Sequence, residues 1–222
     1  MKFVTARYND EEFIGILIEG KGIAPIEGCN LPYHTMNELI ANITEYEMSF
    51  LKRISHEYHD LVPLDEVELC APIPCPKQDV ICLGLNYADH RKNAEKFSKE
   101  AFHAEQNDPA VYFSKRVSVS SGDGSDIYLP QDLSKQYDYE AELGVILAKD
   151  AYCVKAEDAQ EYIFGYTVIN DMTARDVQLA HKQWYFGKSL DGFTPMGPCI
   201  TTADEFSYPP VLSIESRGHG QL

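Results

Sequence analysis

The stretch that decides the fold lies at residues 164–176 and reads Phe-Gly-Tyr-Thr-Val-Ile-Asn-Asp-Met-Thr-Ala-Arg-Asp. Its first six residues are mostly β-branched or aromatic, as is typical of a buried β-strand. Thr173 and Asp176 have the three-residue spacing of a capping pair, which predicts that a helix begins at Thr173. Asp171 would then lie between the end of the strand and the N-terminus of the helix.

Two further acids, Glu140 and Glu142, lie in a second predicted strand at residues 139–143. Alternate residues of a strand share a face, so the two carboxylates would point the same way. Three carboxylates converging with Asp171 would repel one another unless a cation neutralised them, and oxygen ligands suit magnesium, manganese or calcium better than zinc. By spacing alone, the solvated face of an antiparallel sheet is the commoner arrangement, so both interpretations stay open here.

Other candidate functional side chains flank these acids. Arg175 and Gln178 are one turn apart on the predicted helix, where they could contact a ligand or form an ordinary exposed face. Lys188 lies beside a glycine and could anchor a carboxylate, donate a proton or be solvated. His90 follows the apolar run at 80–83, in a loop where a general base is often found, although a single histidine is more often structural or exposed.

The main part of the chain is predicted to be rich in strands. From Asp79 onward the apolar runs are short, and turns rich in Gly, Ser and Asp separate them. Because these runs do not alternate with helical segments, the pattern favours an α+β fold over βαβ units. The predicted strands are 80–83, 111–113, 143–147, 164–169 and 211–214.

The N-terminal part has a different pattern. Residues 2–8 and 13–18 are predicted to be short strands around an acidic turn. Thr35 and Glu38 form a capping box, and apolar residues then recur at helical spacing. This pattern predicts one helix from Thr35 to about Ser55.

The 222-residue chain is long enough for one large and one small domain. Four prolines between residues 61 and 76 indicate a connector. We therefore expect a small N-terminal domain at 1–70 and a main domain at 71–222.

Composition excludes several classes of partner. The 19 basic and 35 acidic residues give a formal charge of -16, which repels nucleic acid and anionic lipid surfaces.

The six cysteines show neither a Cys-x-x-Cys pair nor the density of a disulfide scaffold, so we expect free thiols. With no signal-peptide core and no long apolar stretch, the prediction is a cytoplasmic protein that binds neither nucleic acid nor membranes.

Five segments taken together are similar to one known family. They are DVICLGLNYADH at 79–90, YEAEL at 139–143, GYTVINDMTARD at 165–176, GKS at 187–189 and PMGP at 195–198. In order and spacing they closely resemble the fumarylacetoacetate hydrolase family over about residues 72–215. The resemblance implies an α+β fold, with mixed β-strands rolled into a β-roll or barrel around a central site and a small N-terminal β-containing domain, and usually a homodimer.

The resemblance also implies roles for individual residues. Its metal ligands correspond to Glu140, Glu142 and Asp171, which would hold magnesium, with manganese or calcium as alternatives. The residue corresponding to its water-activating base is His90. Its substrate contacts correspond to Tyr87, Arg175, Gln178 and Lys188, of which Lys188 is also a candidate catalytic residue, and Lys115 matches a family lysine of less certain purpose.

The chain departs from the family pattern at two places. Related members carry a glutamate three residues after the histidine that orients it, whereas this chain has Asn93 there and Glu95 two residues further on. Family members also continue for several strands beyond the position where this chain stops, at Leu222. We therefore expect a catalytic domain shortened at its C-terminus, whose open strand edges need another chain to cover them.

The implied function is a metal-dependent hydrolase that cleaves a carbon–carbon bond in a 2,4-dioxo acid of acylpyruvate type. The alternatives are a decarboxylase, tautomerase or isomerase of 2-oxo diacids, which would use the same metal-stabilised enolate, or an inactive shortened member of the family. In each enzymatic case the partner would be a small 2-oxo acid.

Overall fold

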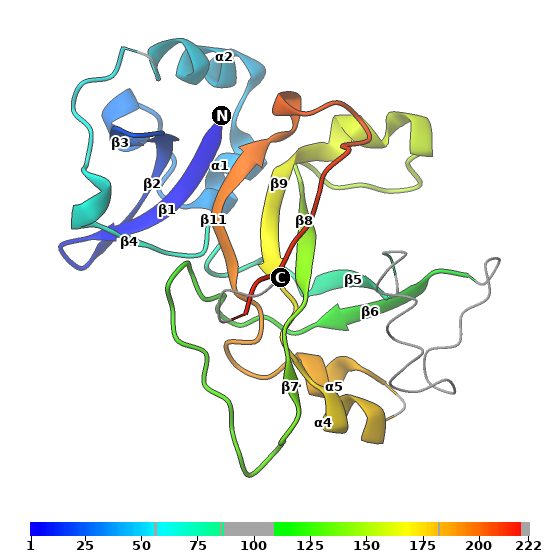
Figure 1. Cartoon of the computed structure of the whole chain (residues 1–222). Coiled ribbons are helices and arrows are strands. Elements are labelled where there is room, and N and C mark those ends of the chain that lie inside the picture. The colour runs from blue at the N-terminus through cyan, green and yellow to red at the C-terminus, as the bar shows by residue number, and fades with distance from the viewer. Residues whose placement is uncertain (56, 85, 87–108, 182, 219–222) are drawn as a thin grey trace.

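The structure is a computed structural model that describes residues 1–55, 57–84, 86, 109–181 and 183–218. It is a mixed sheet and helix structure, as the α+β prediction requires (Figure 1). The strands are β1 (Lys2–Tyr8), β2 (Glu11–Ile18), β3 (Gly22–Pro25), β4 (Glu68–Leu69), β5 (Val80–Gly84), β6 (Val111–Lys115), β7 (Tyr137–Asp138), β8 (Ala141–Leu147), β9 (Ile163–Asn170), β10 (Thr173–Ala174) and β11 (Met196–Thr202). The α-helices are α1 (Met36–Asn42), α2 (Glu45–Ile54), α4 (Arg175–Ala180) and α5 (Tyr185–Lys188).

The main sheet has seven strands and combines both ends of the chain. Its order is β3-β2-β1-β11-β9-β8, with β4 also paired to β1, and all of these pairings are antiparallel. β1 pairs directly with β11, through Lys2 with Thr201 and Phe3 with Ile200. Over the described residues the sheet is open and does not close into a barrel. The predicted division at residue 70 therefore falls between strands that share one sheet.

The hydrophobic core extends across this sheet. Phe3, Leu39 and Leu51 from the N-terminal part pack in one cluster with Phe164 and Ile200. This packing holds β9 and β11 against the N-terminal strands. Both strands lead into the end of the molecule that carries the candidate site. No helix in the described ranges is long and apolar enough to cross a membrane.

The predicted single helix between residues 35 and 55 is wrong in one respect, because the structure has two helices there. α1 and α2 each begin with a complete capping box, formed by Thr35 with Glu38 and by Thr44 with Glu47. Ile43 ends α1 with an extended backbone, at φ -61° and ψ 129°. The second capping box starts a new helix while the apolar spacing continues, so periodicity alone did not reveal the break.

The predicted strands have a mixed outcome. Those at 2–8, 13–18, 80–83, 111–113, 143–147 and 164–169 all lie within observed strands. The predicted strand at 211–214 is wrong, since those residues have no regular structure and Val211 is 91% exposed. β11 was missed because Gly197 and Pro198 interrupt its pattern.

The elements that carry the candidate site lie around β8, the edge strand of the main sheet, and next to one end of that sheet (Figure 1). β5 and β6 form a two-stranded antiparallel sheet, and β7 pairs with β10. The short helices α4 and α5 pack on each other beside these strands. A second apolar cluster, of Met172, Ala174, Val177 and Phe193, packs at this end.

Candidate active site

A cavity of about 1160 Å3 lies between the β5–β6 ladder, β8 and the two helices α4 and α5. Every predicted site residue that lies in the described ranges lines it. These residues are Glu140, Glu142, Asp171, Arg175, Gln178 and Lys188, and Lys115 lines it as well. Segments separated by tens of residues thus contribute side chains to one space.

Backbone pairing places Glu140 beside Asp171. β8 and β9 are antiparallel neighbours, with Ala141 opposite Asn170. At the end of this ladder the backbone N–H of Asp171 donates to the carbonyl of Glu140 at 2.9 Å, and the N–H of Glu140 donates to Asn170 Oδ1 at 3.2 Å. The sequence had predicted that Glu140 lies within a strand. In the structure it lies just before β8.

Lys188 joins two of the predicted acids. Its Nζ donates to Glu140 Oε2 at 2.9 Å, to Asp171 Oδ2 at 2.6 Å and to the hydroxyl of Thr173 at 2.9 Å. The ammonium also lies 5.2 Å from the centroid of the Phe113 ring. With a side chain only 3% exposed, Lys188 is a buried cation whose charge two carboxylates balance.

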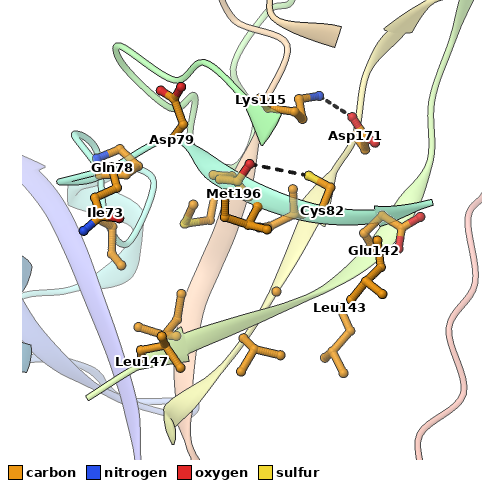
Figure 2. A pocket seen from close by; sticks show the side chains of 18 of the residues that line it. Ile73, Gln78, Asp79, Cys82, Lys115, Glu142, Leu143, Leu147, Asp171 and Met196 are labelled. Carbon is orange, nitrogen blue, oxygen red and sulfur yellow. Dashed lines mark hydrogen bonds and ion pairs between the residues drawn. The ribbon is translucent and has the colours of Figure 1, made fainter. Parts of the chain in front are cut away.

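Lys115 holds the other oxygen of Asp171. It is completely buried at the end of β6, and its Nζ donates to Asp171 Oδ1, to the carbonyl of Phe193 at 2.8 Å and to the carbonyl of Met172 at 3.2 Å. Figure 2 shows this contact with Asp171 at one side of the cavity, apart from the carboxylate of Glu142. Three acceptors therefore satisfy the three ammonium protons of Lys115.

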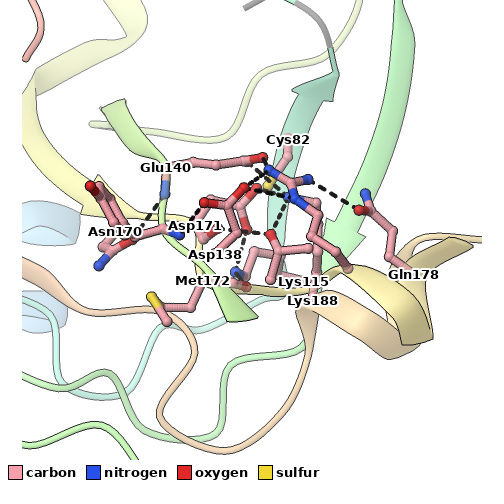
Figure 3. A network of polar contacts seen from close by, with 12 residues as sticks. Cys82, Lys115, Asp138, Glu140, Asn170, Asp171, Met172, Gln178 and Lys188 are labelled. Carbon is pink, nitrogen blue, oxygen red and sulfur yellow. Dashed lines mark hydrogen bonds and ion pairs between the residues drawn. The ribbon is translucent and has the colours of Figure 1, made fainter. Parts of the chain in front are cut away.

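Arg175 connects α4 to the acids. Its Nε and Nη2 donate to Asp138 Oδ2 at 2.8 and 2.6 Å, Nη2 also donates to Glu140 Oε1, and Nη1 donates to Gln178 Oε1 at 3.1 Å. Figure 3 shows the resulting network, in which dashed contacts join the acids Glu140 and Asp171 to the cationic groups around them.

The start of the helix α4 differs from the prediction. Thr173 belongs to β10, and α4 begins only at Arg175. The Thr173 hydroxyl donates to the carbonyl of Asp171 at 3.0 Å instead of capping a helix. Asp176 accepts from the Ser134 hydroxyl and from the N–H of Lys135, so its carboxylate fixes a neighbouring loop. Arg175 and Gln178 do share one face, as predicted, and that face points into the cavity.

The network shifts the protonation behaviour of its members. Burial by itself raises the pKa of Glu140, but Lys188 and Arg175 outweigh it and hold that pKa at about 2. Burial lowers the pKa of Lys115, and the neighbouring Asp171 opposes this. Burial also raises the pKa of the Cys82 thiol, to about 12, so this cysteine in the cavity wall is not a reactive thiolate.

The donor set fits a hard divalent cation in its chemistry. Glu140 and Asp171 already point their oxygens at a single positive charge, the Lys188 ammonium, and Glu142 lines the same cavity. Within the described ranges, no three His, Cys, Asp or Glu side chains stand close enough to hold a metal ion in this arrangement.

His90, Tyr87, Asn93 and Glu95 all lie outside the described residues. Their predicted roles stay predictions.

Sequence reasoning missed two members of the network. Asp138 binds Arg175, and Thr173 binds Lys188. Asp138 had a usable signal, because it continues the alternation of Glu140 and Glu142 two residues earlier in the same segment. The sequence carried no such signal for Thr173, because the spacing from Thr173 to Asp176 suggested a helix cap.

Comparison with known proteins gives a consistent result. The sequence model of the family described as fumarylacetoacetate (FAA) hydrolase C-terminal matches residues 79–222. The oxaloacetate tautomerase YisK of Bacillus subtilis is 33% identical over 236 residues, which cover 100% of this chain and 76% of that protein. The mitochondrial oxaloacetate tautomerase FAHD2B of Bos taurus is 36% identical over 184 residues, covering 80% of this chain and 54% of that protein. The chain thus spans about half the length of this mitochondrial relative.

Two solved structures show the same fold. A fumarylacetoacetate hydrolase from Exiguobacterium antarcticum superposes with a TM-score of 0.71 at 33% identity, covering 93% of this chain and 68% of that one. A maleylpyruvate hydrolase from Sphingobium sp. SYK-6, in complex with manganese(II) and pyruvate, gives a TM-score of 0.70 at 26% identity, covering 94% of this chain and 70% of that one. These matches confirm the predicted fold type.

Proposed function

Because the chain belongs to the fumarylacetoacetate hydrolase family, we propose that it interconverts the keto and enol forms of a small 2-oxo dicarboxylic acid such as oxaloacetate, with the help of a divalent metal. One observation carries this proposal. Two buried carboxylates, Glu140 and Asp171, converge on one positive charge in a cavity that Arg175 and Gln178 also line. Cation-binding and anion-binding groups thus face the same space.

The metal would be held by Glu140, Glu142 and Asp171. When bound, magnesium or manganese supplies positive charge next to the substrate's 2-oxo oxygen, where negative charge develops during enolisation. The manganese and pyruvate in the maleylpyruvate hydrolase neighbour support a divalent ion and a 2-oxo acid in this fold.

Arg175 and Gln178 are the proposed anchors for a substrate carboxylate. Arg175 presents a planar guanidinium and Gln178 a neutral amide, on one face of α4. A net charge of -16 repels a dianion at long range, so attraction must come from cations inside the cavity.

Lys188 is the proposed proton carrier. In the direction from enol to ketone, its ammonium would give a proton to the carbon next to the 2-oxo group, and the resulting neutral amine would take up the proton that the enol O–H releases, which restores the ammonium. In the reverse direction the neutral amine would remove the carbon proton, the electron pair would move to the oxygen, and the ammonium so formed would give a proton to that oxygen. Its burial beside Phe113 would keep water from competing for that proton.

Tautomerisation is the first candidate. Unlike hydrolysis, it needs no attack by water and therefore no water-activating base. The oxaloacetate tautomerases with 33% and 36% identity support this choice. Hydrolysis of an acylpyruvate is the second candidate, supported by the maleylpyruvate hydrolase likeness. There a hydroxyl from water would add to the distal carbonyl, the carbon–carbon bond would break, and the departing enolate carbon would take a proton. That reaction needs a base, for which His90 is the prediction.

The test is deuterium exchange into oxaloacetate, followed by proton NMR in D2O with magnesium. We expect the chain to accelerate deuterium incorporation at the carbon next to the ketone without forming pyruvate. Glu140→Ala combined with Glu142→Ala should abolish the acceleration. The matched control is Glu157→Ala with Asp158→Ala, which removes two exposed charges from the short 3-10 helix η3 (Ala156–Tyr162) and should leave the rate unchanged.

Three outcomes separate the candidates. Pyruvate and carbon dioxide released from oxaloacetate would indicate a decarboxylase. Cleavage of an acylpyruvate without exchange into oxaloacetate would favour the hydrolase. An exchange rate that survives the double substitution would contradict the proposed role of these acids.

A further inference from the structure

Two lysines bind the two oxygens of Asp171 in different ways. Lys115 contacts Oδ1 and Lys188 contacts Oδ2. Both ammonium groups are buried, so exposure does not distinguish them. Their other partners do.

Lys115 is fixed by the backbone. Besides Asp171, its ammonium binds the carbonyls of Met172 and Phe193, which belong to the segments on either side of the helices α4 and α5. Backbone carbonyls cannot turn away as side chains can. Lys115 therefore holds one Asp171 oxygen in place and leaves the other directed at the cavity.

Lys188 is held by side chains instead. The acceptors that the structure gives its ammonium are the carboxylates of Glu140 and Asp171 and the hydroxyl of Thr173. Its ammonium lies between the two acids that are proposed to hold the metal. It thus lies between the two acids and supplies there one of the two positive charges that a divalent cation would bring.

We propose that Lys188 is an internal substitute for the metal and is displaced when the ion binds, whereas Lys115 is a positioning residue that keeps Asp171 ready for the ion. This inference rests on the proposed function, because it assumes the same carboxylate site. Displacement would free the Lys188 ammonium for the substrate only after the metal has bound. The order of binding would then be metal first and 2-oxo acid second.

The two lysines should affect metal affinity in opposite directions. Removing Lys188 removes a competitor for Glu140 and Asp171, so the metal should bind more tightly. Removing Lys115 leaves Asp171 without its anchor, so the metal should bind more weakly. A purely electrostatic effect would have the same sign for both, because each substitution removes one positive charge near the site.

The experiment measures binding of Mn2+ alone to the whole chain, using the electron paramagnetic resonance signal of the free ion. We expect Lys188→Met to tighten binding by about tenfold or more, and Lys115→Met to weaken it by about tenfold or more, as for charged hydrogen bonds gained or lost in a buried site. Circular dichroism checks that each variant is folded. If Lys115→Met does not fold, Lys115→Gln, which keeps a donor of smaller size and no charge, replaces it and should weaken binding less severely.

The outcomes distinguish the inference from the function on which it rests. Tighter binding by both variants would show that the change in Mn2+ affinity comes only from the loss of positive charge. It would overturn the positioning role of Lys115. Unchanged or weaker binding by Lys188→Met would overturn the displacement. If neither the unsubstituted chain nor any variant binds Mn2+, the proposed function itself fails. Calorimetry with oxalate adds a check on order, since oxalate should bind the unsubstituted chain only when Mn2+ is present.

Discussion

Glu140 is the residue on which the network depends most. Its carboxylate accepts from both Lys188 and Arg175 while its side chain is only 10% exposed. A buried carboxylate is costly unless it is paired, and here two cations compensate for the lost water. The charge of Glu140 is therefore part of the folded state.

This pairing predicts a dependence of stability on pH. The pKa of Glu140 is about 2 in the folded chain against an ordinary value of 4.5, so its contribution is complete above pH 4.5 and is lost as the pH falls towards 2. The size of that contribution is on the order of 3 kcal/mol. In urea titrations at several pH values, Glu140→Gln should be less stable at pH 7 but should lose less stability between pH 4.5 and 2.

The exposed Glu157 supplies the control for this measurement. Glu157→Gln should follow the unsubstituted chain across the same pH range. If the Glu140→Gln curve ran parallel to the other two, the proposed pairing of Glu140 with the two cations would be incorrect.

At this scale the sequence located the acids of the cavity better than their partners. Alternation predicted one face for Glu140 and Glu142, and both line the cavity although Glu140 precedes β8. The contacts of Lys115 and Lys188 depend on β6 and α5 meeting at Asp171, and no local pattern encodes that meeting. From the residues alone Lys188 was a candidate with its role left open, and Lys115 came only from family resemblance, without a defined purpose.

Among the elements, the packing of α5 on α4 positions Lys188. Gly187 lies so close to α4 that a Cβ atom on it would stand 2.6 Å from the backbone nitrogen of Gln178 and 2.8 Å from its Cα. The backbone of α4 cannot yield as a flexible side chain would. A glycine at this position therefore lets the two helices approach closely enough for Lys188 to reach the acids.

Gly187→Ala should push α5 away from α4. Overpacking of this kind costs about 1 to 3 kcal/mol, and we expect the melting temperature and the deuterium exchange rate to fall together. Differential scanning calorimetry and the NMR assay measure the two effects. Gln183→Ala, an exposed neighbour, should change neither by much. Full exchange activity in Gly187→Ala would show that Lys188 does not need this helix contact.

The elements themselves were predictable where their signals were local. Thr35 with Glu38 marked the start of α1 correctly, because a capping box is a short-range pattern. β10 was mistaken for the beginning of a helix, because its pairing with β7 is a long-range contact. The strand predicted at 211–214 failed for a related reason, since apolar residues form a strand only when a neighbour is there to pair with them.

In the whole molecule, the two ends of the sequence form one sheet. The N-terminal amine of Met1 donates to Thr202 Oγ1 at 2.7 Å, and the rings of Phe3 and Phe164 lie 5.7 Å apart in the core. The sequence predicted a separate N-terminal domain from its change in pattern and its prolines. The pairing of β1 with β11 could not be read from it, because β11 itself was not recognised.

This arrangement predicts a single cooperative unfolding transition. Phe3→Ala should destabilise the chain by about 3 to 5 kcal/mol, as for other buried phenylalanines, although Phe3 is far from the cavity along the chain. Circular dichroism reports the whole fold, and fluorescence of the only tryptophan, Trp184, reports the cavity. The two transitions should coincide and shift together in the variant.

Tyr46→Ala, at a site 79% exposed, should leave both transitions nearly in place. A cavity that unfolded separately from the rest, with Trp184 fluorescence unaffected by Phe3→Ala, would instead support independent domains at 1–70 and 71–222.

The most direct test of the account is a crystal structure of this chain with Mn2+ and oxalate, in which anomalous scattering locates the ion. We predict one manganese bound by carboxylate oxygens of Glu140, Glu142 and Asp171 at roughly 2.0 to 2.6 Å, the range for hard cations, with the Lys188 ammonium moved from between the acids towards oxalate. An ion found elsewhere, with Lys188 still joining Glu140 to Asp171, would contradict it.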